Sequence, residues 1–345
     1  MTSWKKIKNH PVFIGGHRKC GTTMLAALFD GHKDLFVYPG ESGFFYKFYP
    51  VFDDLKLSDS EKERWAVKAI LKALDDILRE WVGSDACPGY SFAKLKESFR
   101  ECLQTGQKKT RDFFTAVIYA AWKTLSQSSE DQKCWVEKTT SVEIYAATLF
   151  EWYPEAKFIH LLRDPRDNYA AIKAGWEKEY CHYFDSKERL LQSVIDRGKL
   201  GMEFAELNQK RYGRDRYFIV RYEDLVTDPV TTLKKIAGFL NISYQVSLLT
   251  PSFCGIPWDG NNFENKKFHS ISRGSLGRWK KRITPHEAKV IEHNFRPVME
   301  RFGYASCYTE IEAADAATEH YKWFNYAQTY SLKTPASRKR LRRKL

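Results

Sequence analysis

The stretch PVFIGGHRKCGTTMLAAL, residues 11–28, decides the fold of this chain. It begins with a short apolar run at 12–14, continues as a turn rich in glycine and cations, and opens an amphipathic segment with Thr22 and Thr23. Glycines let backbone N–H groups converge on an anion, and a helix N-terminus adds partial positive charge. Lys19 adds a full charge. The stretch predicts a strand, a phosphate-binding loop and a helix; the alternative is an ordinary glycine turn.

The spacing from Gly16 to Gly21 has the frame of a Walker A loop, but the residues that follow differ. A nucleotide triphosphatase has lysine and then serine or threonine there, for the β- and γ-phosphates and Mg²⁺. This chain has Thr22 and Thr23 instead, and its lysine, Lys19, comes two places before the second glycine. The loop is therefore expected to bind a phosphate but to suit Mg-ATP hydrolysis poorly.

The composition is that of a packed protein with an anionic ligand. The chain has 345 residues, 43% of them hydrophobic, and a formal net charge of +13. Residues 337–345 supply six of the cations, and such a run is typical of a solvated chain end. Because no nucleic-acid motif accompanies it, we expect no nucleic-acid partner.

Cysteine usage and hydropathy indicate the cellular compartment of the protein. The seven cysteines form no C-x-x-C pair and no metal spacing, which favours reduced thiols in a cytoplasmic protein. The N-terminus does not resemble a signal peptide, and no apolar run approaches the length of a membrane span. We therefore predict a cytoplasmic location, no membrane span and no bound metal.

Apolar runs alternate with helical patterns along most of the chain. Strands are expected at 12–14, 35–38, 134–136, 158–162 and 217–220. This rhythm predicts an α/β fold with a central, mostly parallel sheet flanked by helices. We expect one domain over 1–310, with a helical insert at about 57–129 and a lid loop at about 250–280. A C-terminal helical extension and basic tail would follow at 311–345.

Polar residues follow the ends of the predicted strands. Lys19, Glu41, Lys138, Arg163 and Tyr222 each come just after an apolar run. Ligands of open α/β sheets bind beyond the carboxyl ends of the strands. These five side chains are therefore expected at one edge of the sheet.

Four stretches resemble the sulfotransferase family, whose donor is 3'-phosphoadenosine 5'-phosphosulfate (PAPS). They are, in order, RKCGTT (18–23), FIHLLRDPRDNYAAI (158–172), RYEDLVTDPVTTLKKIAGFL (221–240) and GSLGRWKKRITPHEAKVIEHNFRPVMERFGY (274–304). The resemblance implies a P-loop-like fold with a helical insert. YPGESGFF (38–45) and WVEKTTSV (135–142) look closer to the heparan-sulfate and tyrosylprotein branches, which use a glutamate base, than to the cytosolic branch, which uses a histidine.

The resemblance also implies roles for single residues. Glu41 would be the base, Lys19 would stabilise the leaving phosphate, and Lys138 would face the sulfuryl group or the acceptor. The loop would hold the 5'-phosphate, Arg163 and Arg273-Gly274 the 3'-phosphate, and Tyr222 would lie near adenine. The expected donor-binding residues are Arg18, Lys19, Cys20, Gly21, Thr22, Thr23, Met24, Arg163, Ala171, Tyr222, Arg273 and Gly274.

Several positions depart from the family pattern or have a second interpretation. Ala171 stands where the family usually has a serine, so that Ser275 or Asn168 would have to replace one hydrogen bond to the 3'-phosphate. Met24 stands where the cytosolic branch stacks a tryptophan on adenine, and Cys20 is not expected to be a nucleophile. Glu41 has the alternative of pairing with a lysine, and Lys138 that of pairing with Glu137 or another carboxylate.

The resulting hypothesis is metal-free, in-line sulfuryl transfer from PAPS, with 3'-phosphoadenosine 5'-phosphate (PAP) as product. The acceptor would be a hydroxyl or amine of a small molecule or natural product. A saccharide acceptor is the first alternative. A P-loop kinase acting on a small molecule and a non-catalytic nucleotide-binding protein are the others. The sequence leaves the oligomeric state open.

Overall fold

A computed structural model describes residues 3–82, 90–126, 132–264, 267 and 270–330. The chain forms two compact units. The first comprises residues 1–162 and 204–273, and the second comprises residues 163–203 and 274–345. The assignment of 1–310 to one domain stays a prediction. The basic run at 337–345 lies outside the described residues.

The first unit is built on one parallel sheet, which confirms the predicted fold class. The strands are β1 (Pro11–Gly15), β2 (Leu35–Val37), β3 (Cys134–Lys138), β4 (Lys157–Leu162) and β5 (Tyr217–Arg221). Their order is β2-β3-β1-β4-β5, and all four pairings are parallel. From central β1 the chain crosses to the β2 edge, and from β3 it crosses to β4. The order therefore reverses at β1, which is where α/β sheets bind ligands.

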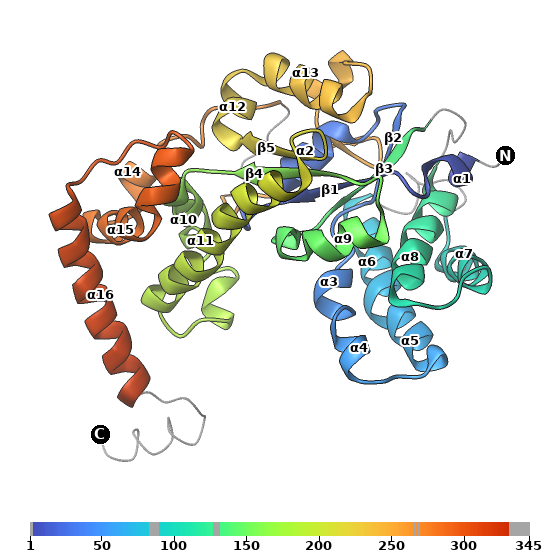
Figure 1. Ribbon diagram of the computed structural model, residues 1–345, viewed down its shortest axis with the longest axis horizontal. Helices are drawn as coiled ribbons and strands as arrows, with labels where there is room; N and C mark the ends of the chain where they lie inside the picture. Colours follow the sequence, from blue (N-terminus) through green and yellow to red (C-terminus); the bar gives the residue numbers. More distant parts are fainter. Residues whose placement is uncertain (1–2, 83–89, 127–131, 265–266, 268–269, 331–345) are drawn as a thin grey trace. The chain divides into compact units, whose positions relative to one another are not determined.

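Alternate residues of β1 enter two different cores. Val12 and Ile14 pack in one cluster, and Phe13 packs in another, because successive strand side chains point to opposite faces. Helices α2 (Thr22–Phe29), α12 (Tyr222–Thr227) and α13 (Pro229–Leu240) lie on the first face, and α9 (Ala146–Trp152) lies on the other (Figure 1).

A helical insert completes the second face. Its elements are α3 (Phe44–Lys47), α4 (Val51–Asp54), α5 (Asp59–Ala66), the π-helix η1 (Val67–Leu71), α6 (Lys72–Trp81), α7 (Phe92–Gln104) and α8 (Thr110–Leu125). Helices thus begin at Phe44, earlier than the expected boundary near residue 57. Phe44 lies fully buried between Phe48 and Phe114, with ring centroids 4.7 and 4.8 Å away. Burial of these aromatic rings joins the insert to the sheet.

The stretch at 250–272, expected as an irregular loop, contains a short antiparallel ribbon. Its strands are β6 (Ser252–Phe253) and β7 (Ile256–Pro257). Cys254 and Gly255 form the turn with φ of 51° and 78°, the left-handed pair that two-residue hairpins need. Asp30 Oδ2 accepts hydrogen bonds from Ser252 Oγ at 2.6 Å and Gly255 N at 2.8 Å. The carboxylate therefore fixes the ribbon to the end of α2.

The second unit is helical. It contains α10 (Pro165–Lys173), η3 (Tyr180–His182), the first part of α11 (Lys187–Tyr212), α14 (Trp279–Arg282), α15 (Pro285–Arg301) and α16 (Glu310–Tyr330). Helix α15 begins with a capping box formed by Thr284 and Glu287, with Pro285 in the first turn. The remaining short elements, all in the first unit, are α1 (Ser3–Ile7), η2 (Val142–Tyr145) and η4 (Val246–Leu249).

No helix in the described part of the chain is long and apolar enough to cross a bilayer. The six cysteines within that part, all but Cys87, are free thiols.

The turn after β1 tolerates no side chain at Gly16. Its φ is +135°, and an added Cβ would lie 2.4 Å from the carbonyl oxygen of Leu161. We expect Gly16→Ala to lower the free energy of unfolding by more than about 2 kcal/mol. Gly238→Ala is the matched control, because no neighbouring atom lies within 4 Å of a Cβ added at that helical position. This substitution should raise the free energy of unfolding by about 0.5–1 kcal/mol. Equal effects in urea titrations would contradict this account.

Candidate functional site

The turn from Gly16 to Gly21 has the backbone of an anion cradle. Gly16, Lys19 and Gly21 all have positive φ, at 135°, 64° and 99°. An added Cβ on Gly21 would lie 2.5 Å from the ring of Tyr222, so this ring packs against the loop. Gly21 also caps α2 without a side chain, so the first N–H groups of that helix are left for a ligand. The strand, loop and helix are as predicted, and their geometry fits a phosphate.

The Lys19 ammonium contacts the loop that follows the β6–β7 ribbon. Its Nζ donates a hydrogen bond to the Asn261 carbonyl at 3.1 Å and lies 4.0 Å from the centre of the Phe263 ring. Neither partner could be predicted from a motif in the sequence. The only available signal was the glycine- and asparagine-rich composition of this stretch. A donor phosphate at Lys19 has to compete with these two contacts.

The other loop residues differ in burial. Cys20 is 4% exposed and packs in the core cluster of α2; its place at the donor stays a prediction. Thr22 is buried, whereas Arg18, Thr23 and Met24 are half-buried. Only the half-buried side chains retain a surface that a ligand can reach.

Glu41 and Lys138 form an ion pair at the carboxyl edge of the sheet. Glu41 Oε1 accepts hydrogen bonds from Lys138 Nζ at 2.8 Å and Thr140 Oγ1 at 2.5 Å. The two residues meet because Glu41 follows β2 and Lys138 ends β3, its neighbour. The pairing of Glu41 with a lysine is thus present. Of the two pairings considered for Lys138, with Glu137 or with another carboxylate, the structure has the second, and the partner is Glu41.

The ion pair controls the charge of Glu41. Burial raises the pKa of the Glu41 carboxyl, but the Lys138 ammonium and the hydrogen bonds from Lys138 and Thr140 outweigh it and hold the pKa below its ordinary value. The Lys138 side chain is 5% exposed, whereas that of Glu41 is 38% exposed. Within the described part of the chain, both hydrogen bonds go to Oε1. Both side-chain donors thus bind one oxygen of a carboxylate that stays partly exposed.

Glu137 fixes the backbone beside Glu41. Its Oε1 accepts hydrogen bonds from Ser42 N at 3.2 Å, Ser42 Oγ at 2.7 Å and Thr139 Oγ1 at 2.6 Å. Burial raises the pKa of the Glu137 carboxyl. Because Ser42 directly follows Glu41, this buried carboxyl holds the Glu41 loop against β3. The sequence signal for it is an acidic residue directly after the apolar run at 134–136, next to Lys138.

A mostly apolar cavity of about 260 Å³ opens beside this pair. Glu41, Lys138 and Thr23 line it together, so the ion pair and the phosphate loop reach the same space. Helix α6 of the insert and the β6–β7 ribbon supply further walls. The described residues hold no cluster of three or more His, Cys, Asp or Glu side chains arranged for a metal ion.

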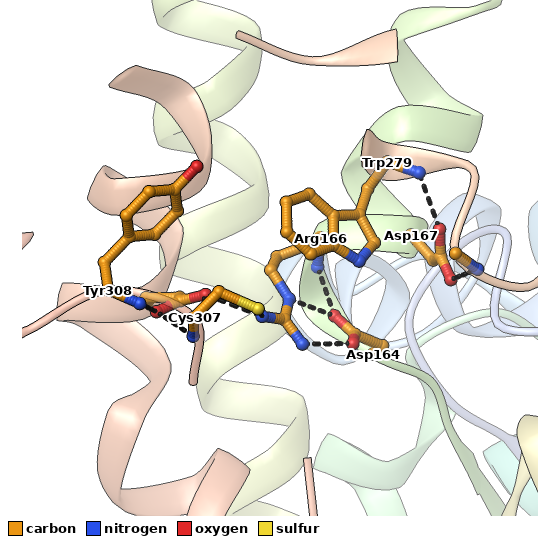
Figure 2. Close-up of polar contacts among 8 residues, drawn as sticks. Asp164, Arg166, Asp167, Trp279, Cys307 and Tyr308 are labelled. Atoms are coloured by element: carbon orange, nitrogen blue, oxygen red, sulfur yellow. Dashed lines mark hydrogen bonds and ion pairs between the residues drawn. The ribbon is translucent and has the colours of Figure 1, made fainter. Parts of the chain in front are cut away.

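In the second unit, Arg163 and Asp167 hold the stretch that begins at Gly274. Arg163 Nη2 donates a hydrogen bond to the Ser275 carbonyl at 3.2 Å. The Asp167 carboxylate accepts hydrogen bonds from Gly277 N at 2.6 Å and Trp279 N at 2.9 Å (Figure 2). Ser275, one of the two residues suggested as a replacement at Ala171, thus lies next to Arg163.

Arg166 is a structural cation in the same unit. Its guanidinium donates two hydrogen bonds to Asp164, at 3.0 and 2.7 Å, and one to Glu292 at 2.6 Å (Figure 2). It also lies 4.5 Å from the Trp279 ring. Burial opposes the charge, but these carboxylates raise the pKa of Arg166. Glu292 in turn accepts hydrogen bonds from the N–H groups of Cys307 and Tyr308, all at 3.0 Å.

The residues expected at the donor are divided between the two units. Residues 18–24, Tyr222 and Arg273 belong to the first, and Arg163, Ala171 and Gly274 belong to the second. Arg273 ends the first unit and donates a hydrogen bond to the Thr227 carbonyl. Ala171 is half-buried on α10. Their roles at a donor stay predictions.

A family model described as "Sulfotransferase family" matches residues 11–246. Among curated proteins, mouse carbohydrate sulfotransferase 5 is 25% identical over 181 residues, 47% of this chain and 45% of the relative. Drosophila melanogaster protein-tyrosine sulfotransferase is 22% identical over 238 residues, 69% of this chain and 39% of the relative. The chain thus spans less than half the length of these two relatives.

Two solved structures share the fold. The sulfotransferase domain of the Synechococcus PCC 7002 olefin synthase has a TM-score of 0.57 and 19% identity, with 87% of this chain and 96% of that chain covered. The sulfotransferase domain of the curacin biosynthetic pathway has a TM-score of 0.56 and 17% identity, with 85% and 97% covered.

Because its pKa is lowered on folding, ionised Glu41 should stabilise the protein at neutral pH and lose this effect in acid. We expect the difference in unfolding free energy between wild type and Glu41→Gln to be constant well above 4.5, the ordinary pKa. The difference should shrink as the pH falls through the folded-state pKa. Urea titrations at several pH values measure it. A difference that does not change with pH would contradict the lowered pKa.

Loss of the Asp167 carboxylate should release the stretch 274–279. Asp167→Ala leaves the N–H groups of Gly277 and Trp279 without this acceptor, so the unfolding free energy should fall by about 2–4 kcal/mol. Hydrogen exchange of those two amides should accelerate. The control is Asp185→Ala. The Asp185 side chain is 39% exposed and pairs with Arg189, so the substitution should cost less than about 1 kcal/mol. Unchanged exchange in Asp167→Ala would refute the role of Asp167.

Proposed function

The chain belongs to the sulfotransferase family, and on this premise we propose that it transfers a sulfuryl group in line from PAPS to a hydroxyl or amine of a small-molecule acceptor. The observation that carries the proposal is the Glu41 carboxylate, held through Oε1 by Lys138 and Thr140. It lines the same cavity as Thr23 of the phosphate loop. The proposed base, the buried cation and part of the phosphate loop thus line the same cavity.

Glu41 acts as the base. Its lowered pKa keeps the carboxylate ionised at neutral pH, and Oε2 accepts the proton of the acceptor. The acceptor oxygen or nitrogen forms a bond to sulfur while the bond from sulfur to the donor phosphate oxygen breaks. Lys138, paired with Glu41, faces the anionic group in transit. A positioned base of this kind contributes about 10²–10⁴-fold in rate.

The phosphate loop stabilises the departing phosphate. Negative charge grows there as the bond to sulfur breaks, and Lys19 together with the N-terminus of α2 offsets it. Donors that are already fixed in place need no reorganisation during the reaction. PAPS supplies the sulfuryl group, and PAP is the product.

The rest of the donor assignment follows the family resemblance. Arg18 to Met24 would hold the 5'-phosphate side, and Tyr222 would lie near adenine. Arg163, with Gly274 and Arg273, would hold the 3'-phosphate. Ser275 replaces the serine missing at Ala171, a proposal that its contact with Arg163 supports.

A saccharide acceptor is the second candidate. It is favoured by the 25% identity to a carbohydrate sulfotransferase over 181 residues. The resemblance of YPGESGFF to the heparan-sulfate and tyrosylprotein branches stays a prediction. A glutamate base agrees with it, and so does the similarity to a carbohydrate and a protein-tyrosine sulfotransferase.

Replacing the base should lower turnover strongly and leave the affinity for the donor nucleotide unchanged. We expect Glu41→Gln to lower kcat about 10²–10⁴-fold, since the amide cannot accept the proton. The dissociation constant for PAP, measured by calorimetry, should stay within a factor of about two. Glu155→Gln, at an exposed position, is the control and should keep wild-type turnover. Full activity of Glu41→Gln would remove Glu41 from this role.

The nucleotide that stabilises the protein distinguishes a sulfotransferase from a kinase. At 100 times its dissociation constant, PAP should raise the unfolding free energy by about 2.7 kcal/mol, and Mg-ATP should not. Stabilisation by Mg-ATP alone would favour the kinase. PAP binding without turnover on any acceptor would favour a non-catalytic nucleotide-binding protein.

A further inference from the structure

The cavity beside Glu41 discriminates between acceptors by its lining. Ten of its seventeen lining residues are apolar or aromatic. Those with the largest side chains are Val37, Tyr38, Ile77, Trp81, Phe253 and Trp258. Its volume of about 260 Å³ lies just below the range of roughly 300–1,000 Å³ that ligand pockets span. The space suits a small molecule, or the reactive end of a larger one.

Most polar groups in the walls already have partners within the protein. Asp30 Oδ2 accepts from Ser252 Oγ and Gly255 N, and the Asn261 carbonyl accepts from Lys19. The reaction itself uses Glu41, Lys138 and Thr23. Among the other lining residues, the buried hydroxyl of Tyr38 has no hydrogen-bond partner in the described part of the chain, so few polar groups remain for an acceptor. A sugar carries a hydroxyl on nearly every carbon, and each hydroxyl buried without a partner weakens binding about tenfold. The lining therefore opposes a saccharide.

Two aromatic rings from distant parts of the chain lie together in the lining. Trp81 ends α6 in the insert, and Phe253 ends β6 in the ribbon. Their ring centroids are 5.2 Å apart and the planes are inclined at 53°. Trp81 is 44% exposed, so its ring extends to the rim of the cavity. The pair offers a continuous apolar surface from solvent to the interior.

From this lining we infer that the acceptor is an apolar alcohol with a single reactive hydroxyl. The inference rests on the proposed sulfuryl transfer. The carbon skeleton lies against Trp81 and Phe253, and the hydroxyl reaches Glu41. The hydroxyl proton passes to Glu41 Oε2, the hydroxyl oxygen bonds to sulfur, and the bond from sulfur to the donor phosphate breaks. The products are an alkyl sulfate and PAP.

A homologous series of alcohols tests this assignment. The wild-type chain is given PAPS and straight-chain primary alcohols from 1-butanol to 1-octanol, and the alkyl sulfate is measured by mass spectrometry. Each added methylene should raise kcat/KM about fourfold until the cavity is filled. Methyl glucoside and a tyrosine-containing peptide serve as the saccharide and peptide arms. Both should give lower kcat/KM than 1-octanol.

Matched tryptophan variants connect the chain-length effect to the cavity. Trp81→Ala should lower kcat/KM for 1-octanol about tenfold and for 1-butanol less than threefold, with PAP affinity unchanged. The control is Trp65→Ala. Trp65 is 47% exposed, belongs to α5 of the same insert and lies outside the cavity lining. It should leave both alcohols unaffected.

Three results would overturn the inference. They are no increase in kcat/KM with chain length, a higher kcat/KM for the glucoside or the peptide than for 1-octanol, and equal effects of Trp81→Ala and Trp65→Ala. If PAP binds and a sulfated glucoside or peptide forms, the acceptor class is wrong but the sulfotransferase function stands. If PAP does not bind and no product forms, both proposals fail.

Discussion

The left-handed turn after β1 is the constraint on which the site depends. An ideal Cβ at Gly16 would lie 2.4 Å from the Leu161 carbonyl on β4, and one at Gly21 would lie 2.5 Å from the Tyr222 ring after β5. Only glycine lets the chain turn so close to strand β4 and to the ring of Tyr222. That close approach brings Lys19 and the open N-terminus of α2 to the carboxyl edge of the sheet, where backbone donors and charge converge on one anion.

One ion pair sets the electrostatics beside that turn. Lys138 is almost wholly buried, and an unpaired buried ammonium would be strongly destabilising. Glu41 compensates it, and the same contact lowers the pKa of Glu41. The carboxylate is therefore a weaker base than an isolated glutamate but is ionised throughout the neutral range. Beneath it, Glu137 uses the hydrogen bonds from Ser42 and Thr139 to hold the loop.

The charged side chains of the run RDPRD, residues 163–167, make different contacts in the second unit. Arg166 is occupied by Asp164 and Glu292, and Asp167 binds two backbone N–H groups of the 274–279 stretch. These bonds fix the segment that carries Arg163 and Ser275. A guanidinium that recognises a phosphate needs such a rigid support, because a loose side chain loses entropy on binding.

The sequence by itself determined the strand–loop–helix at 11–28, the strands of the parallel sheet and the placement of Glu41 and Lys138 at one edge of it. Each follows from local patterns, since apolar runs define strands and neighbouring parallel strands end at one edge. Only the tertiary structure decided that Lys138 pairs with Glu41 while Glu137 bonds Ser42, because adjacent strand residues point to opposite faces. It also decided the contacts of Lys19 with Asn261 and Phe263 and of Trp81 with Phe253. These join residues more than 150 positions apart, and no local pattern encodes such pairs.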